Sequence, residues 1–299
     1  MKILLIDIDS KIPNLALMKL SAYHKSIGNK VFLNECENPD FVYASAIFKG
    51  SLQKSLNLKH EYNWKIAMGG SGIDLNRKLP DNVEYIMPDY SLYSIDYSMG
   101  FTSRGCINRC KFCVVPEKEG EIQDHASIVE FMNEKHKKLI LLDNNFLASP
   151  KWKENLQYII DNKIKVNISQ GLDFRLLAEE NSEMLANTMT RNHTFKSNKI
   201  HFAFDDIKYK RLFIKKMTFL LKHIKPYRIM IYILIGFNSI FEEDYERFKL
   251  VRDFGFDPYI MPYNKTSKIQ SKKEIDFARW VNRRLYKVCE FKDYMGRIK

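Results

Sequence analysis

The chain has 299 residues, of which 45% are hydrophobic, enough to bury a core in one large domain or two modest ones; this excludes a disordered chain. It carries 48 Lys and Arg against 36 Asp and Glu, a formal net charge of +12. Its longest apolar runs have the length of a strand and are too short to span a membrane, and Asp7 and Asp9 interrupt the first run before the core of a signal peptide develops. We therefore expect a soluble, cytoplasmic protein with no membrane partner.

The first 97 residues alternate between strand-like and helix-like segments. Strands are expected at Lys2–Ile8, Lys30–Leu33, Phe41–Phe48, Lys65–Met68 and Val83–Met87. The clearest helix spans Leu15–Ser26, with Asn14 as its cap and Gly28 at its end. This alternation is typical of a small parallel sheet of Rossmann type, so the fold class is α/β and the first domain is expected to cover residues 1–97.

A glycine-rich run, Gly69-Gly70-Ser71-Gly72, directly follows one of these strands. Such a loop can approach a ligand phosphate, but the run lacks the full dinucleotide-binding fingerprint. We favour the other interpretation, in which it is a tight turn of a scaffold domain.

From about residue 98 a second pattern begins, with six strand-then-helix units in succession. The strands are expected at Gly100–Ser103, Lys138–Leu142, Val166–Ser169, Ile200–Phe204, Arg228–Ile235 and Pro258–Met261. Helices are expected near Asp124–His136, Pro150–Asn162, Leu177–Thr190, Ile207–His223, Phe241–Phe254 and Lys272–Cys289. Right-handed crossovers would curl these units into a partial (βα)6 barrel of TIM type over residues 98–270, followed by a basic helical extension over 271–299.

Polar residues follow nearly all of these strands, where a barrel collects them at one mouth. They are Asp143-Asn144-Asn145, Gln170-Gly171-Leu172-Asp173, Asp205-Asp206, Gly236-Phe237-Asn238 and Tyr263-Asn264. Loops are polar in any protein, but five such positions together with a cysteine loop indicate a functional site. For Asp205 and Asp206, capping of the following helix is the favoured role.

Five cysteines are present, and three of them, Cys106, Cys110 and Cys113, lie within eight residues in the spacing C-x3-C-x2-C. Three thiolates on one loop suit a soft metal or an iron–sulfur cluster, whereas structural zinc needs a fourth ligand. Cys36 and Cys289 stand alone and are expected to be buried as small hydrophobic residues.

The cysteine loop, with Phe112 before the last cysteine, resembles the C-x3-C-x-aromatic-C signature of the radical S-adenosylmethionine (SAM) superfamily. The resemblance covers roughly residues 98–270. It implies a [4Fe–4S] cluster held by the three cysteines, SAM bound at the fourth iron, and one-electron cleavage of SAM to a 5′-deoxyadenosyl radical. It also implies a reductant such as flavodoxin or ferredoxin.

The same resemblance implies which residues contact SAM. Asp143, Asn144 and Asn145 take the place of the family's Gly-Gly-Glu and depart from it, although their oxygens can accept from an ammonium group. Gln170, Asp173 and Arg175 are implied to contact the ribose or the carboxylate; alternatively, Asp173 and Arg175 pair with each other. Phe112, Ile235, Gly236 and Phe237 complete the implied cofactor-binding set.

Two subgroups of the family are disfavoured by what the sequence lacks. The N-terminal region resembles a cobalamin-binding domain, but residues 1–97 contain no Asp-x-His-x-x-Gly run, so we expect no bound cobalamin and interpret the domain as a degenerate one. Methylthiotransferases hold a second cluster on three upstream cysteines, whereas only Cys36 precedes the loop here.

Two segments concentrate the positive charge. Lys208–Arg228 has eight basic residues and no acid, and 265–299 has eleven basic and four acidic residues. With aromatics such as Phe213, Phe219 and Trp280 they suit phosphate contacts and base stacking, so nucleic acid is a candidate substrate beside a peptide or a small metabolite. They equally suit ordinary solvated helix faces. Two alternatives to the enzyme stay open: a non-catalytic metal-binding protein whose three clustered cysteines form a structural site, and a nucleic-acid-binding module.

Overall fold

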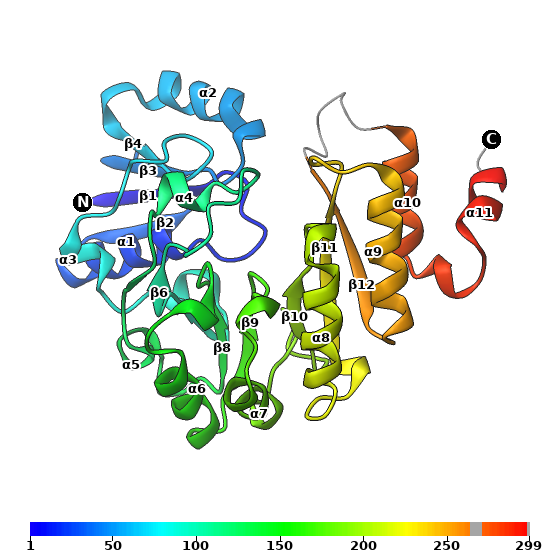
Figure 1. The fold of residues 1–299 in the computed structure, drawn as a ribbon. Helices are drawn as coiled ribbons and strands as arrows, with labels where there is room; N and C mark the ends of the chain where they lie inside the picture. The colour runs from blue at the N-terminus through cyan, green and yellow to red at the C-terminus, as the bar shows by residue number, and fades with distance from the viewer. Residues whose placement is uncertain (264–270, 298–299) are drawn as a thin grey trace. The chain divides into compact units, whose positions relative to one another are not determined.

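The structure, a computed structural model, describes residues 1–263 and 271–297 (Figure 1). The contacts divide the chain into two units: unit 1 comprises residues 1–106 and 114–140, and unit 2 comprises 107–113 and 141–299. Both units are α/β with parallel sheets, which confirms the expected fold class at that level. The predicted domain boundaries after residues 97 and 270 stay predictions, and Asn264 lies outside the described residues.

Unit 1 is built on a four-stranded sheet in the order β2-β1-β3-β4. Its strands are β1 (Lys2–Asp7), β2 (Lys30–Leu33), β3 (Phe41–Ser45) and β4 (Ile66–Gly69). All three pairings are parallel, as the alternation of apolar segments and helices predicted. Strand β3 ends three residues earlier than predicted, and β4 begins and ends one residue later than predicted.

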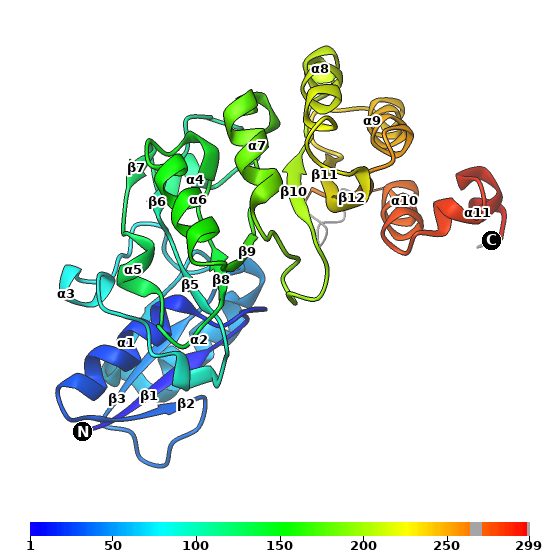
Figure 2. The same cartoon turned by 90° about the horizontal axis from the view of Figure 1, so that it is seen from below.

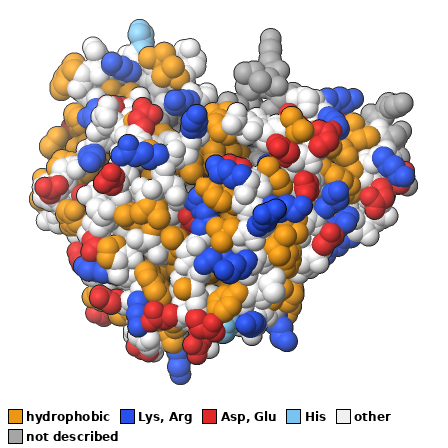
Figure 3. Space-filling model, in the orientation of Figure 1, with side chains coloured by type: hydrophobic (Ala, Val, Ile, Leu, Met, Phe, Trp, Pro, Cys, Tyr) orange, Lys and Arg blue, Asp and Glu red, His pale blue; other side chains and the backbone are white. Residues whose placement is uncertain are grey.

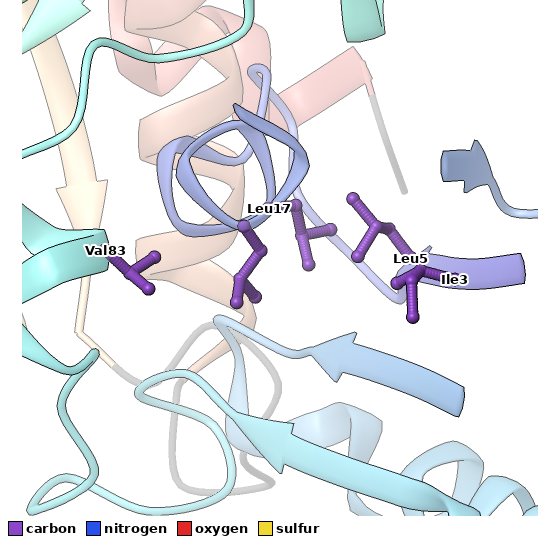
Figure 4. Close-up of a cluster of buried hydrophobic side chains, with 5 residues drawn as sticks. Ile3, Leu5, Leu17 and Val83 are labelled. Atoms are coloured by element: carbon purple, nitrogen blue, oxygen red, sulfur yellow. The ribbon is translucent and has the colours of Figure 1, made fainter. Parts of the chain in front are cut away.

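Helix α1 (Leu15–Ser26) packs against this sheet through an apolar core. It begins as predicted, because the Asn14 side chain accepts a hydrogen bond from the N–H of Leu17. Leu17 packs with Ile3, Leu5 and Val83 (Figure 4).

Val83 lies in the short helix α3 (Asp81–Glu84), so the strand predicted at Val83–Met87 is wrong. Pro80 before the helix and Asp81 in its first turn both favour a helix start. The apolar residue that suggested a strand is instead buried against α1.

The rest of unit 1 consists of short elements. These are η1 (Lys49–Ser51), α2 (Leu52–Tyr62), η2 (Asn63–Lys65), η3 (Tyr90–Tyr93), β5 (Ser98–Gly100), β6 (Ser103–Arg104), α4 (Val115–Lys118), β7 (Gln123–Asp124), α5 (Ile128–Phe131) and β8 (Lys138–Leu141).

The helix predicted over Asp124–His136 covers only α5, because Asp124 belongs to a strand pair with β6 and the chain leaves the helix at Met132. After α5, the Asn133 N–H donates to Ser98 Oγ (2.9 Å) and the Lys135 N–H donates to Asn133 Oδ1 (3.0 Å). These side-chain bonds compete with continuation of the helix.

The glycine-rich loop after β4 is a tight turn against the backbone that follows β3. The Gly72 N–H donates to the Ala46 carbonyl (2.9 Å), and a Cβ at Gly72 would lie 2.6 Å from the Phe48 carbonyl oxygen. Gly70 has φ +96° and equally leaves no room for a side chain, since its Cβ would lie 2.2 Å from the Ala46 oxygen. Close packing of backbone on backbone therefore accounts for the glycines, as the favoured interpretation expected.

Unit 2 contains a parallel sheet in the order β10-β11-β12, with strands β10 (Ile200–Ala203), β11 (Ile229–Ile235) and β12 (Asp257–Pro262). Residues of β11 alternate between buried and half-buried. Helices α8 (Lys210–Leu220) and α9 (Phe241–Asp253) cover one face of this sheet (Figures 1 and 2). Phe213 of α8 stacks on Phe204 after β10, with ring centroids 4.2 Å apart, so the covered face is an aromatic core.

The other elements of unit 2 are η4 (Phe146–Ala148), α6 (Trp152–Asp161), β9 (Lys165–Ile168), η5 (Phe174–Leu176), α7 (Glu179–Asn187), η6 (Ile207–Tyr209), η7 (Pro226–Arg228), α10 (Lys272–Asn282), η8 (Leu285–Lys287) and α11 (Phe291–Arg297). The single helix predicted over Lys272–Cys289 ends at Asn282. There the Asn282 side chain accepts from the Ile260 N–H (2.8 Å) and donates to its carbonyl (2.9 Å), and Arg284 turns the chain at φ +59°. This bond to β12 is a tertiary contact that helical periodicity does not reveal.

The packing of the glycine-rich loop makes a direct prediction for stability. Gly72→Ala should lower the free energy of unfolding by about 1–3 kcal/mol, because the Phe48 carbonyl would have to move away from the new Cβ. Gly50→Ala is the control, since a Cβ there meets nothing within 4 Å. Urea unfolding followed by circular dichroism compares the two, and equal midpoints would contradict the packing argument.

Candidate functional site

The cysteine segment is shared between the two units. Cys106 belongs to unit 1, where its N–H donates to the Gly120 carbonyl (3.2 Å). Cys110 and Cys113 belong to unit 2, and the Cys113 N–H donates to the Cys110 carbonyl (3.0 Å), so a single turn carries both thiols. All three cysteines are half-buried. Within residues 1–263 and 271–297, no group of three or more His, Cys, Asp or Glu side chains is arranged to hold a metal ion.

The chemistry of this segment nevertheless fits an iron–sulfur cluster. Its donors are three thiols, the ligand type that such clusters require. Arg109 and Lys111, both exposed, alternate with the cysteines. That Cys106, Cys110 and Cys113 together hold such a cluster stays a prediction.

Phe112 connects the cysteine segment to the loop after β11. Its ring meets the ring of Phe237 edge to face, with centroids 5.4 Å apart and planes at 74°. Phe237 in turn packs on Tyr263, at 4.7 Å, just past the end of β12. Two residues that the resemblance implies as cofactor contacts, Phe112 and Phe237, are thus in direct contact in unit 2.

Gly236 lies between Ile235, which is buried, and Phe237, which is half-buried. It adopts φ +71°, a conformation that favours glycine. A Cβ at this position would lie 3.2 Å from Oε1 of Glu274. The sequence interpretation did not single out Glu274. Ser271 and Glu274 have the spacing of a capping box, which forms at the start of α10 and could have drawn attention to this residue.

Asp173 and Arg175 pair with each other. Arg175 Nε donates to Asp173 Oδ1 and Nη2 donates to Oδ2, both at 2.7 Å, so the fork of this guanidinium holds the carboxylate of Asp173. Asn108 of the cysteine segment also donates to Asp173 Oδ2 (2.9 Å). Burial by itself would raise the pKa of the Asp173 carboxyl, but the bonds from Arg175 and Asn108 hold it below its usual value. The pair therefore anchors the cysteine segment to the start of η5.

The polar residues after β8 and β9 differ in exposure. Asp143 and Asn145 are buried, Asn144 is half-buried, and Gln170 is exposed. The Asn145 carbonyl begins η4 by accepting from the Ala148 N–H (3.0 Å). Contact of these four side chains with SAM stays a prediction.

The two aspartates after β10 have separate roles. Asp206 caps η6, as predicted, by accepting from the Lys208 N–H (2.9 Å). Asp205 does not cap a helix but accepts from the Leu234 N–H on β11 (3.1 Å). Burial raises the pKa of the Asp205 carboxyl, although this bond and the charge of Arg247 act in the opposite direction.

A buried ion pair joins the ends of β10 and β11. Asp244 and Arg247, one turn apart on α9, are both fully buried and paired with each other. Arg247 also donates to the carbonyls of Phe204 and Leu234, each at 2.8 Å. The sequence interpretation missed this pair because spacing alone does not show burial.

Asp244 also holds the loop that carries Gly236. It accepts from the Gly236 N–H (3.2 Å) and from Ser239 Oγ (2.7 Å). Burial raises the pKa of the Asp244 carboxyl even though these bonds and Arg247 favour its charged form. The conformation at Gly236 and Phe237 therefore depends on this carboxyl group.

Unit 1 has a charged cluster of its own around Glu84. Its Oε1 lies 2.7 Å from Arg104 Nη2, 3.0 Å from Lys19 Nζ and 3.1 Å from His125 Nε2. Burial would raise the pKa of Glu84, but these three partners lower it to about 2. The cluster joins α3, α1 and the segment before Cys106, and so stabilises one side of the cysteine loop.

The basic segments expose their cations and bury much of their aromatic surface. Phe213 and Trp280 belong to the core, whereas Phe219 is half-buried. Arg211, Lys215 and Lys222 on or near α8 are exposed. The exposed cations are therefore available for phosphate contacts. Phe213 and Trp280 are buried and cannot stack on bases, so the prediction of base stacking by these two residues is wrong.

No helix in the described ranges, 1–263 and 271–297, is long and apolar enough to cross a membrane.

No family model matches the chain, and no curated protein matches it. Among solved structures it is similar to SuiB from Streptococcus suis, in a crystal structure bound to the precursor peptide SuiA (14% identity, TM-score 0.44) and in one bound to S-adenosylmethionine (14% identity, TM-score 0.43). Each match covers 84% of this chain but only 58% and 57% of the SuiB chains, so the chain spans less than two thirds of their length. A structural similarity with this identity and TM-score does not support a conclusion about function.

The buried ion pair leads to a stability prediction. Arg247→Met should cost about 3–5 kcal/mol, because it leaves the Asp244 carboxyl and two strand-end carbonyls buried without their partner. The control is Arg252→Met, which removes an exposed pair with Asp253 and should cost less than about 1 kcal/mol. Chemical unfolding measures both; similar costs would show that the buried pair has no special role.

The Glu84 cluster leads to a pH dependence. Its pKa is about 2 in the folded protein against 4.5 normally, so its contribution to stability is present above about pH 4.5 and is lost as the pH falls toward 2. At about 1.4 kcal/mol per pKa unit, that contribution is about 3 kcal/mol. Glu84→Gln should therefore lose stability at pH 7 and differ less from the parent protein at pH 3. A difference independent of pH would contradict the ionic origin.

Proposed function

We propose that the protein is a radical SAM enzyme, in which a [4Fe–4S] cluster on Cys106, Cys110 and Cys113 reductively cleaves S-adenosylmethionine. The observation that carries the proposal is the contact of Phe112 with Phe237, which joins the cysteine motif to the loop after β11. The same resemblance that the cysteine motif carries implies that this loop contacts SAM. The hydrogen bond from Asn108 to Asp173 supports the same placement from the loop after β9.

When bound, the cluster would supply one electron to the sulfonium of SAM, which yields methionine and a 5′-deoxyadenosyl radical. The chain's own residues bind and orient the substrate molecules. The backbone at Gly236 offers close approach to the adenine ring, and Phe237 and Phe112 supply apolar surface beside it. Oxygens of Asp143, Asn144 and Asn145 would accept from the SAM ammonium group.

Asp173 and Arg175 have a positioning role in this proposal. They bind each other, and Asp173 also binds Asn108, so they hold the cysteine segment at the start of η5. Because the guanidinium of Arg175 is paired with Asp173, we do not assign it to the SAM carboxylate. Asp205, after β10, is half-buried, and its Oδ1 accepts a hydrogen bond from the Leu234 N–H (3.1 Å).

The radical would abstract a hydrogen atom from the final substrate. Exposed cations on α8 suit a polyanion, so nucleic acid stays one candidate beside a peptide or a small metabolite. The alternative function, a non-catalytic protein with a structural metal on the cysteines, predicts stoichiometric zinc instead of iron.

Cys110→Ala should abolish SAM cleavage after anaerobic reconstitution, because the variant lacks one of three thiolates. The parent protein should contain about four irons per chain and release 5′-deoxyadenosine when reduced with dithionite; the variant should release none. Cys289→Ala, which changes a half-buried thiol far along the sequence, is the control and should retain cleavage. A parent protein with zinc and no iron, or a cleaving Cys110→Ala variant, would contradict the proposal.

A further inference from the structure

Helix α8 carries a row of three exposed cations on its outer side, which we call the α8 row: Arg211, Lys215 and Lys222. Their spacing of four and seven residues places them on one side of the helix, opposite the side that buries Phe213 and Met217. Lys222 lies just beyond the last turn of α8, and the C-cap residue before it keeps a helical conformation (φ −64°, ψ −14°). Figure 3 shows basic side chains over the part of the surface where α8 lies.

The fold does not use the charge of this row, whereas it does use other cations of the basic segment Lys208–Arg228. Four of the eight basic residues of this segment are bound: Lys208 to Asp206, Lys210 to Glu246, Lys216 to the Leu177 carbonyl, and Arg228 to the carbonyls of Ala186 and Thr188. Within residues 1–263 and 271–297, the three cations of the row have no acidic partner. Lys222 Nζ only lies over the adjacent ring of Phe219, 5.4 Å from its centroid.

The composition of this side of α8 indicates a polyanion. Thr218, a hydroxyl donor, is the exposed residue between Lys215 and Lys222. In α8, all of which is described, Ile214 is the one exposed large hydrophobic residue (37%). The row therefore lacks the apolar centre of a protein interface and the apolar face of a membrane-bound helix. It extends over about 16 Å, a length along which one strand of a nucleic acid presents about five phosphates.

Contacts within unit 2 connect the start of the row to the cysteine segment. Tyr209, two residues before Arg211, packs on the guanidinium of Arg175, whose Cζ lies 5.0 Å from the ring centroid. Arg175 binds Asp173, which accepts the hydrogen bond from Asn108 of the cysteine segment. The row thus begins near the loops after β9 and β10 and continues away from them along the outside of the sheet.

We propose that the α8 row binds the phosphate backbone of a single-stranded nucleic acid, and that this strand is the substrate of the radical enzyme. The inference names the substrate class of the proposed function and rests on that function for the reaction. Cations on phosphates hold and orient a strand without reading its sequence, so a nucleotide beyond Arg211 would be directed to the loops after β9 and β10. A single strand is favoured over a duplex, because a nucleotide must leave the base stack before such loops can reach it.

The experiment measures binding to the full chain by fluorescence anisotropy. The probes are labelled oligouridylate and oligothymidylate of about 20 nucleotides, at salt concentrations from about 50 to about 200 mM. The variant removes the row: Arg211→Gln, Lys215→Gln and Lys222→Gln combined. The control removes the same charge from exposed positions elsewhere in unit 2: Lys153→Gln, Lys163→Gln and Lys165→Gln combined.

The α8 variant should bind about tenfold or more weakly than the parent protein at low salt. The slope of log affinity against log salt should become shallower by about 2, because each phosphate contact of a single strand contributes about 0.7. The control should keep the affinity and the slope of the parent protein. Binding of either oligonucleotide through the row supports the proposal, and the tighter of the two tells RNA from DNA.

Four results would overturn the α8 row. They are a parent protein that binds neither oligonucleotide, an unchanged slope in the α8 variant, an equal loss in the control, and a row that prefers polyglutamate or phosphatidylserine vesicles to both oligonucleotides.

Failure of the proposed function gives a different result, because the anisotropy measurement needs neither a cluster nor SAM. In that case the reconstituted parent protein releases no 5′-deoxyadenosine with dithionite, while binding that depends on the row still supports a nucleic-acid site. A parent protein that cleaves SAM but binds neither oligonucleotide overturns the row and leaves the proposed function standing.

Discussion

The ion pair of Asp244 and Arg247 is the interaction on which the candidate site in unit 2 depends. Both side chains are fully buried, where unpaired charges would be costly, and each is satisfied by several partners. Arg247 holds the carbonyls at the ends of β10 and β11, and Asp244 holds Gly236 and Ser239. One charged pair thus determines where two strands end and how the loop after β11 is shaped.

The positions of the site residues follow from that constraint. Phe237 emerges from the loop that Asp244 holds, and there it meets Phe112 of the cysteine segment. The second attachment of this segment is polar, through Asn108 to the Asp173–Arg175 pair. An aromatic contact and a charged anchor, from loops after two different strands, together hold the segment of Cys110 and Cys113. This double attachment fixes the segment of Cys110 and Cys113 within unit 2.

Unit 1 supports its part of the cysteine loop by different means. Glu84 gathers Arg104, Lys19 and His125, and backbone contacts from Gly120 and Glu121 hold Cys106 and Gly105. Buried charge and close backbone packing thus hold unit 1's part of the cysteine loop.

Periodicity and local chemistry were sufficient for the parallel α/β elements and for helix α1 with its Asn14 cap, because each depends on residues close together in the sequence. Local signals failed where distant contacts decide: Val83 is helical against α1, Asn282 ends a helix by binding β12, and Asp205 serves β11 rather than a cap. The contact of Phe112 with Phe237 and the burial of Arg247 likewise exist only in the folded chain, since a sequence shows which side chains are present but not which of them lose their water.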